Sequence, residues 1–217
     1  MVRDFFEGTL RNLLSIYTGI NLAWHLLAAL FTAGLVLSGA DWRFFEATRF
    51  DALTPIILIA GIGGFFTPVI IPVGLYVYGE FRRNRHLVQM GAAAGQASVL
   101  AYFVTIIYKA FTGRTEPEFL THYITADYSR DFNFGIIEHG VFWGWPSSHT
   151  AVAFAGALTI ALMTRNQSLR IAVLSGAVFI AFGAAVGFHW ISDVVAGVIL
   201  GCVVGVVVAR YFSKKQK

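Results

Sequence analysis

The sequence predicts an all-α integral membrane protein, a bundle of six transmembrane helices with an amphipathic interfacial helix before them. The first observation behind this prediction is the composition: 57% of the 217 residues are hydrophobic, 13% are charged, and the mean hydropathy is +0.67. A soluble domain carries roughly 25% charged residues, so this chain lacks the polar surface that a soluble globule needs. The single cysteine, Cys202, also excludes an intrachain disulfide scaffold.

The second observation is the number of long apolar stretches. A helix needs about 20 mainly apolar residues to cross the hydrocarbon core of a bilayer, and six stretches approach or exceed this length. The six predicted spans are residues 20–40, 53–79, 87–108, 148–163, 171–188 and 191–209. In the second span, Pro68 and Pro72 predict a kink or a break. No repeat or linker divides the chain, so residues 1–217 are expected to form a single six-span membrane domain.

Residues 1–18, before the first span, have apolar side chains at helical spacing with charged side chains between them. The charged members of this segment are Arg3, Asp4, Glu7 and Arg11. Such a pattern predicts an amphipathic helix that lies in the membrane interface. A short solvated tail is the alternative.

The basic residues are distributed unevenly between the two sides of the membrane that six spans define. Eleven of the 16 Lys and Arg residues fall on the side that holds both termini, and the other five fall on the opposite side. The positive-inside rule therefore predicts that both termini are cytoplasmic. The net charge of +4 is then a signal of topology, so the expected partner is the bilayer and not a nucleic acid.

Polar residues from distant parts of the sequence meet at the outer membrane edge in this topology. Lys109 ends the third span and Arg114 follows it, residues 146–149 (Pro-Ser-Ser-His) open the fourth span, and His189 and Asp193 lie between the fifth and the sixth. Ionisable residues at membrane depth are candidates for function by default, because placing them there is unfavourable. The long outer loop 110–146 is expected to lie next to them.

The two histidines and the aspartate suit proton and group transfer. His189 and Asp193 are spaced i, i+4, so a helix would place them on one face. An aspartate that binds one imidazole nitrogen orients the ring and leaves the other nitrogen free to attack an electrophile. His149 is then available as a general acid toward a leaving oxygen.

The neighbouring residues suit an anion. Ser147 and Ser148 begin a predicted helix, where unpaired backbone N–H groups and the helix dipole favour phosphate. Lys109 and Arg114 add positive charge, and the planar guanidinium group matches phosphate oxygens. Together the seven residues predict phosphoryl transfer that requires no metal and no other cofactor.

This pattern resembles the type-2 phosphatidic acid phosphatase superfamily, whose signatures are K-x6-R-P, P-S-G-H and S-R-x5-H-x3-D. Residues 109–117 are similar to the first signature, residues 146–149 to the second with Ser148 in place of glycine, and residues 182–193 to the third. The resemblance implies that His189 attacks phosphorus and forms a phosphohistidine. It also implies that Asp193 orients this histidine and that His149 protonates the leaving group.

The chain departs from the family pattern at two cationic positions. Glu116 stands in place of the arginine of the first signature, and Gly183 in place of that of the third. We expect Arg114 to replace the first arginine, and restoration of arginine at Gly183 to raise the affinity for monoesters. In keeping both histidines and the aspartate but fewer cations, the chain resembles sphingomyelin and inositol phosphorylceramide synthases, which transfer a phospho-headgroup.

The predicted function is hydrolysis of a lipid phosphate monoester or diphosphate at the outer membrane face. Phospholipids, polyprenyl diphosphates and lipid A-type molecules are the candidate substrates. A short chain without a further domain suggests the bacterial inner membrane, with the site on the periplasmic side. A lipid phosphotransferase is the first alternative, and a non-catalytic membrane protein or transporter is the second.

Overall fold

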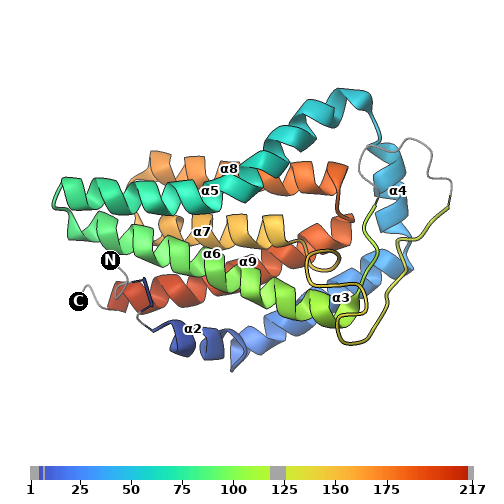
Figure 1. The fold of residues 1–217 in the computed structure, drawn as a ribbon, viewed down its shortest axis with the longest axis horizontal. Coiled ribbons are helices and arrows are strands. Elements are labelled where there is room, and N and C mark those ends of the chain that lie inside the picture. Colours follow the sequence, from blue (N-terminus) through green and yellow to red (C-terminus); the bar gives the residue numbers. More distant parts are fainter. Residues whose placement is uncertain (1–4, 7, 118–125, 215–217) are drawn as a thin grey trace.

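The computed structural model describes residues 5–6, 8–117 and 126–214, and these residues form an all-α bundle (Figure 1). Five helices are long and apolar enough to cross a membrane. They are α3 (Ile20–Leu37), α5 (Thr54–Phe81), α6 (Arg85–Thr112), α8 (Gln167–Gly187) and α9 (Ile191–Lys214). The helix α7 (Ser148–Met163) is apolar but has only 16 residues. All six predicted spans are therefore helical, and five of them have the length of a membrane span.

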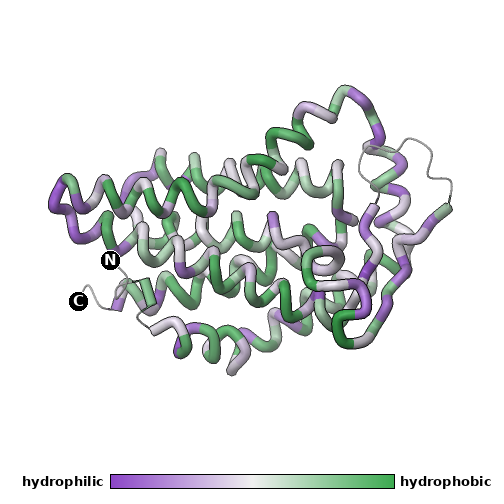
Figure 2. Tube along the Cα trace, viewed as in Figure 1, coloured by the Kyte–Doolittle hydropathy of each residue, from purple (hydrophilic) through white to green (hydrophobic). Residues whose placement is uncertain are grey.

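Hydrophilic residues lie at the two ends of the bundle and hydrophobic residues lie between them (Figure 2). Large apolar side chains such as Ile62, Phe65 and Ile70 of α5 are exposed on the outside of the bundle. This distribution suits a bilayer as the surrounding solvent, because lipid tails bury the apolar exterior and leave both ends in water.

The helix of the first predicted span ends at Leu37, three residues earlier than expected, and a separate helix follows it. The helix α3 ends at Leu37, and α4 (Ala40–Ala47) follows after Gly39, which has a φ of +70°. A residue in the left-handed region ends a helix, and glycine adopts this conformation without steric strain. The short 3₁₀ helix η1 (Asp51–Leu53) then leads into α5.

The predicted disturbance in the second span takes the form of a bend. The helix α5 runs without a break through Pro68 and Pro72, and Figure 1 shows that its axis changes direction along its length. Proline lacks an N–H and removes one helical hydrogen bond, so it bends a helix that its neighbours hold in place.

Near the N-terminus, α2 (Thr9–Ile16) is shorter than the predicted helix 1–18, of which residues 1–4 and 7 lie outside the described part. Its Asn12 is buried and its Nδ2 donates to Gln96 Oε1 of α6 over 2.7 Å. Its Leu10 and Leu14 are exposed. The helix thus binds the bundle through a polar side chain and presents leucines to the surroundings.

The helix α7 lies in the centre of the bundle and packs against α5, α6, α8 and α9. Its closest approach is to α9, where Gly197, Gly201 and Gly205 face α7 backbone atoms. Glycines four residues apart let two membrane helices come close. The helices then gain van der Waals contacts, which stabilise their association because the bilayer provides no hydrophobic driving force between them. This stripe holds the first turn of α7 beside the first turn of α9.

Candidate active site

The two histidines of the candidate site come from different helix ends. His149 lies in the first turn of α7, and His189 lies between α8 and α9. The centroids of the two rings are 6.4 Å apart, within the expected range of about 3–7 Å for two groups that act on one phosphate. Ser147 N–H donates to Asp193 O over 3.1 Å and joins the first turns of α7 and α9. The structure thus brings together two segments that are about 40 residues apart in the sequence.

His189 faces two carboxylates through one ring nitrogen. Its Nδ1 lies 3.1 Å from Glu116 Oε1 and 3.7 Å from Asp193 Oδ2. The nitrogen is buried, and among the described residues it has no partner with hydrogen-bond geometry. Its shorter distance is to Glu116, a residue that the sequence analysis noted only as a departure from the family pattern.

Asp193 belongs to a fully buried ionic network that we call the Arg114 cluster: Asp41, Arg114, Ser192 and Asp193. Arg114 Nη1 donates to Asp193 Oδ1 and, over 2.7 Å, to Ser192 Oγ. Arg114 Nη2 donates to Asp41 Oδ2 over 2.6 Å and to Ser129 O over 2.5 Å, and Nε donates to Ser129 O. Each nitrogen of the guanidinium group thus has a protein acceptor.

These contacts revise the role expected of Arg114. A buried guanidinium group that already donates to two carboxylates, a hydroxyl and a carbonyl has no N–H directed at a phosphate in this structure. Its position therefore suits the orientation of Asp193 and not the binding of an anion. The sequence could not show this because Arg114 meets its partners only after α4 and α9 have packed.

Asp41 is a functional candidate that sequence reasoning missed. It lies in the first turn of α4 and is fully buried. Its Oδ1 accepts from Ser192 N–H over 2.9 Å, and its Oδ2 accepts from Ser192 Oγ over 2.7 Å. The signal available in the sequence was an acidic residue two positions after Gly39, at the same membrane edge as Asp193.

A second group of charged side chains also lies near Nδ1 of His189, and we call its members, Lys109 and Glu116, the Lys109 pair. Lys109 is 1% exposed at the end of α6, and its Nζ donates to Phe142 O over 3.0 Å. The Nζ lies 3.7 Å from Glu116 Oε1, which accepts from Gly144 N–H over 2.7 Å. The contact between the two charges is loose, and Glu116 is 11% exposed.

The two serines have local partners. Ser147 is the N-cap of α7, and its Oγ accepts from Thr150 N–H over 3.4 Å. Ser148 Oγ shares a hydrogen bond of 2.8 Å with Thr105 Oγ1 of α6. The first serine satisfies a backbone donor that the helix start leaves free, and the second ties α7 to α6. Phosphate binding by Ser147 and Ser148 stays a prediction.

Comparison with known proteins agrees with this geometry. The pattern of the PAP2 superfamily matches residues 91–217, which include all seven predicted site residues. The chain belongs to the PAP2 superfamily. It is therefore a multi-pass integral membrane protein of a phosphatase superfamily.

A solved PAP2 structure has the same fold. The crystal structure of a transmembrane PAP2-type phosphatidylglycerolphosphate phosphatase from Bacillus subtilis superposes with a TM-score of 0.59. The match covers 90% of this chain and 96% of that chain, at 21% sequence identity. At this identity the likeness shows the fold. No curated protein matches the sequence significantly.

The helix packing explains one departure from the PAP2 pattern and corrects one expectation. Gly183 of α8 is buried against α5, and a Cβ added there would overlap the Cβ of Ala60 and lie 3.3 Å from Ile56 O. An arginine at position 183 would push α5 and α8 apart. The expectation that this substitution raises phosphate affinity is therefore wrong, because no space for the side chain exists.

The helix α5 also approaches the candidate general acid. A Cβ added at Gly64 would lie 2.8 Å from His149 Cδ2 and 3.1 Å from Ile180 Cγ2. The ring of Phe188 packs against the His149 ring with centroids 4.9 Å apart. Both contacts restrict the imidazole of His149.

Within the described residues, no group of three or more His, Cys, Asp or Glu side chains is arranged to hold a metal ion.

Proposed function

We propose that this protein hydrolyses a lipid phosphate monoester or diphosphate through a phosphohistidine on His189. The observation that carries the proposal is the placement of His149 and His189, with ring centroids 6.4 Å apart and with His189 Nδ1 within 3.1 Å of Glu116 Oε1 and 3.7 Å of Asp193 Oδ2. Because Nδ1 faces Asp193 and Glu116, Nε2 is the nitrogen left to attack phosphorus.

The reaction would proceed in two steps. In the first, Nε2 of His189 forms a bond to phosphorus, the bond from phosphorus to the leaving oxygen breaks, and His149 gives a proton to that oxygen. Asp193, held by Arg114, stabilises the positive imidazole that results. In the second step water attacks phosphorus, His149 takes a proton from the water, and the bond to His189 breaks. Inorganic phosphate leaves, and both histidines return to their first state.

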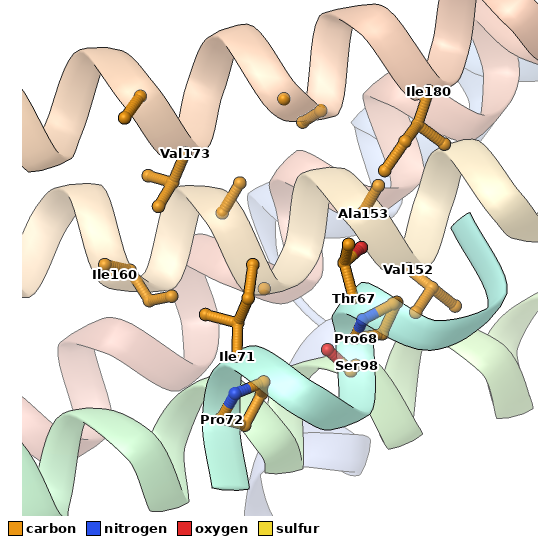
Figure 3. Close-up of a pocket in the computed structure, with 15 residues that line it drawn as sticks. Thr67, Pro68, Ile71, Pro72, Ser98, Val152, Ala153, Ile160, Val173 and Ile180 are labelled. Carbon is orange, nitrogen blue, oxygen red and sulfur yellow. The ribbon is translucent and has the colours of Figure 1, made fainter. Parts of the chain in front are cut away.

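A cavity beside His149 supports a lipid as the substrate (Figure 3). It has a volume of about 220 Å³ and lies between α5, α6, α7 and α8. Its wall includes Val152, Ala153 and Ile160 of α7, so it starts one turn after His149 and follows α7 for about 12 Å at 1.5 Å per residue. An apolar cavity of this position suits a lipid chain whose phosphate lies between the histidines.

The lining of the cavity offers a direct test of this placement. Gly176 of α8 is exposed and lines the cavity, and a Cβ added there meets no atom within 4 Å. Gly176→Phe should fill the cavity and raise KM for long-chain substrates at least tenfold while sparing a short-chain phosphate. Gly74→Phe is the matched control, because Gly74 is exposed on α5, has no neighbour within 4 Å and does not line the cavity.

We further propose that α7 is a sixth span and that residues 1–217 form one membrane domain. The site would then face the periplasm of a bacterial inner membrane, with α2 in the interface and both termini in the cytoplasm. The basic residues Arg82, Arg83 and Arg85, which join α5 to α6 at the end opposite α4, support this orientation (Figure 1). Single cysteines at Arg83 and His139 should be labelled from the cytoplasm and the periplasm respectively.

The decisive experiment measures phosphate release from a panel of lipid phosphates by the purified protein. His189→Ala should abolish release and the acid-labile phosphohistidine, whereas His149→Ala should lower release by about 10²–10⁴-fold. His139→Ala is the matched control, since His139 is exposed in the outer loop. Release that persists in the His189 variant would exclude the mechanism. No turnover of any lipid would favour a non-catalytic membrane protein or a transporter.

Transfer of a phospho-headgroup is the second candidate function. Glu116 favours it, because a carboxylate beside Lys109 and His189 reduces the positive charge available to a doubly charged phosphate. Exchange of headgroups between two lipids without free phosphate would identify this activity.

A further inference from the structure

Glu116 occupies the place where the donors of the candidate site converge. Its Oε1 accepts from Gly144 N–H over 2.7 Å and lies 3.1 Å from His189 Nδ1 and 3.7 Å from Lys109 Nζ. A backbone N–H, an ammonium group and an imidazole are the kinds of group that bind phosphate oxygens. A protein carboxylate is thus already present among them.

The formal charge around His189 is negative because of this carboxylate. With both histidines neutral, two cations and three carboxylates lie within the two ionic groups: Lys109, Arg114, Asp41, Glu116 and Asp193. Their formal sum is −1, and it would be 0 without Glu116. Arg114 is paired with Asp41 and Asp193. Lys109 is therefore the cation of this set nearest to Glu116, and the carboxylate of Glu116 neutralises its charge.

A site of this charge discriminates between phosphate groups by their own charge. A phosphodiester carries one negative charge, while a monoester carries nearly two above its second pKa of about 6. Repulsion by a fixed carboxylate is about twice as strong for the doubly charged group at equal distance, because Coulomb energy scales with the product of the charges. The low exposure of Glu116 reduces the screening of this repulsion by water and salt.

We propose that Glu116 makes the site selective for a phosphate group with a single negative charge: a phosphodiester, or a monoester in its singly protonated form. This rests on the proposed function, since the phosphate must bind between His149 and His189, and it narrows the proposed substrates by disfavouring a diphosphate, which carries more than one negative charge. Glu116 is then a specificity-determining residue. The arginine that the PAP2 pattern has in this place would give the opposite preference.

Direct binding tests the inference without turnover. Butyl phosphate and dibutyl phosphate at pH 8 differ in charge, and calorimetry on the full-length protein in detergent measures the dissociation constant of each. The wild type should bind dibutyl phosphate at least tenfold more tightly than butyl phosphate. Glu116→Gln should remove this preference by tightening the binding of butyl phosphate at least tenfold. Glu138→Gln, an exposed glutamate of the same loop, should leave it unchanged.

A second measurement uses the wild type alone, in case Glu116→Gln does not fold. Between pH 8 and pH 6 butyl phosphate gains a proton, so its binding should tighten relative to that of dibutyl phosphate. Lys109, His149, His189 and Asp193 surround the site and act more strongly on the doubly charged ligand, so the ratio reports the charge of the phosphate together with that of these groups. A ratio that does not change with pH, or a Gln variant that keeps the preference, overturns the inference. The proposed hydrolysis fails separately, through the His189→Ala result.

Discussion

The Arg114 cluster and the Lys109 pair flank the same histidine but differ in every physical respect. In the Arg114 cluster all four residues are buried, and Arg114 and Ser192 donate short hydrogen bonds of 2.6–2.9 Å to Asp41. In the Lys109 pair the charges are 3.7 Å apart, and Glu116 is partly exposed. A closed network has no capacity for a new ligand, whereas a loose pair can exchange partners. We therefore propose that the first orients the histidine and that the second meets the substrate.

The largest effect should follow from opening the closed network. Arg114→Gln leaves Asp41 and Asp193 buried without their cation, and loss of one partner of a buried ion pair is destabilising by about 3–5 kcal/mol. Thermal unfolding in detergent should show a clearly lower Tm, together with loss of activity. An unchanged Tm would mean that the network is not a structural unit.

Removal of the cation from the loose pair should act on binding and not on folding. Lys109→Gln removes a charge-assisted hydrogen bond to the phosphate, which is about 1.5–3 kcal/mol and corresponds to an increase in KM of roughly 10–150-fold. The Tm should change little, because Lys109 lies 3.7 Å from its carboxylate. A drop in Tm as large as that of Arg114→Gln would remove the distinction between the two groups.

A milder change in the closed network should lower kcat more than it alters KM. Asp41→Asn keeps the size of the side chain but removes the charge that Arg114 Nη2 binds, an effect of about 1–3 kcal/mol on stability. Asp193 then loses part of the support that orients His189. Steady-state kinetics should show a fall in kcat with KM within about twofold, and Asp41→Glu should restore part of the rate if position and charge both matter. A rise in KM alone would assign Asp41 to binding.

The smallest effect on stability is expected for Glu116→Gln. The amide oxygen can still accept from Gly144 N–H, and the variant leaves no buried cation without a hydrogen-bond acceptor, so the free energy of unfolding should change by no more than about 1 kcal/mol. The same variant is expected to change the preference between phosphate groups. Glu116→Gln should thus change the specificity with little change in stability. Differential scanning fluorimetry measures the Tm of the variant and checks the second part.

Much of the fold was predictable because hydropathy is a local property. The six predicted spans coincide with α3, α5, α6, α7, α8 and α9 to within a few residues at most ends. The differences lie at the helix ends: α3 stops at Leu37 ahead of Gly39, and α9 continues to Lys214. The helix α4 was not predicted, although it carries Asp41.

The site was predictable in its membership but not in its contacts. The sequence identified His149, His189 and Asp193 from their order and spacing, and these residues do meet at one end of the bundle. It predicted an anion-binding Arg114, which instead binds two carboxylates, and it expected room for an arginine at Gly183, where α5 excludes even a Cβ. Both differences concern partners that are distant in the sequence.

By itself the sequence determined the membrane class, the helices and the set of candidate site residues. It could do so because apolar length and residue type decide these properties along a single segment. Only the tertiary structure decided which charges neutralise one another. Arg114 became buried between Asp41 and Asp193, while Glu116 came to lie among the donors around His189. Electrostatic pairing depends on distances between segments, and these distances exist only once α4, α6, α7 and α9 have packed.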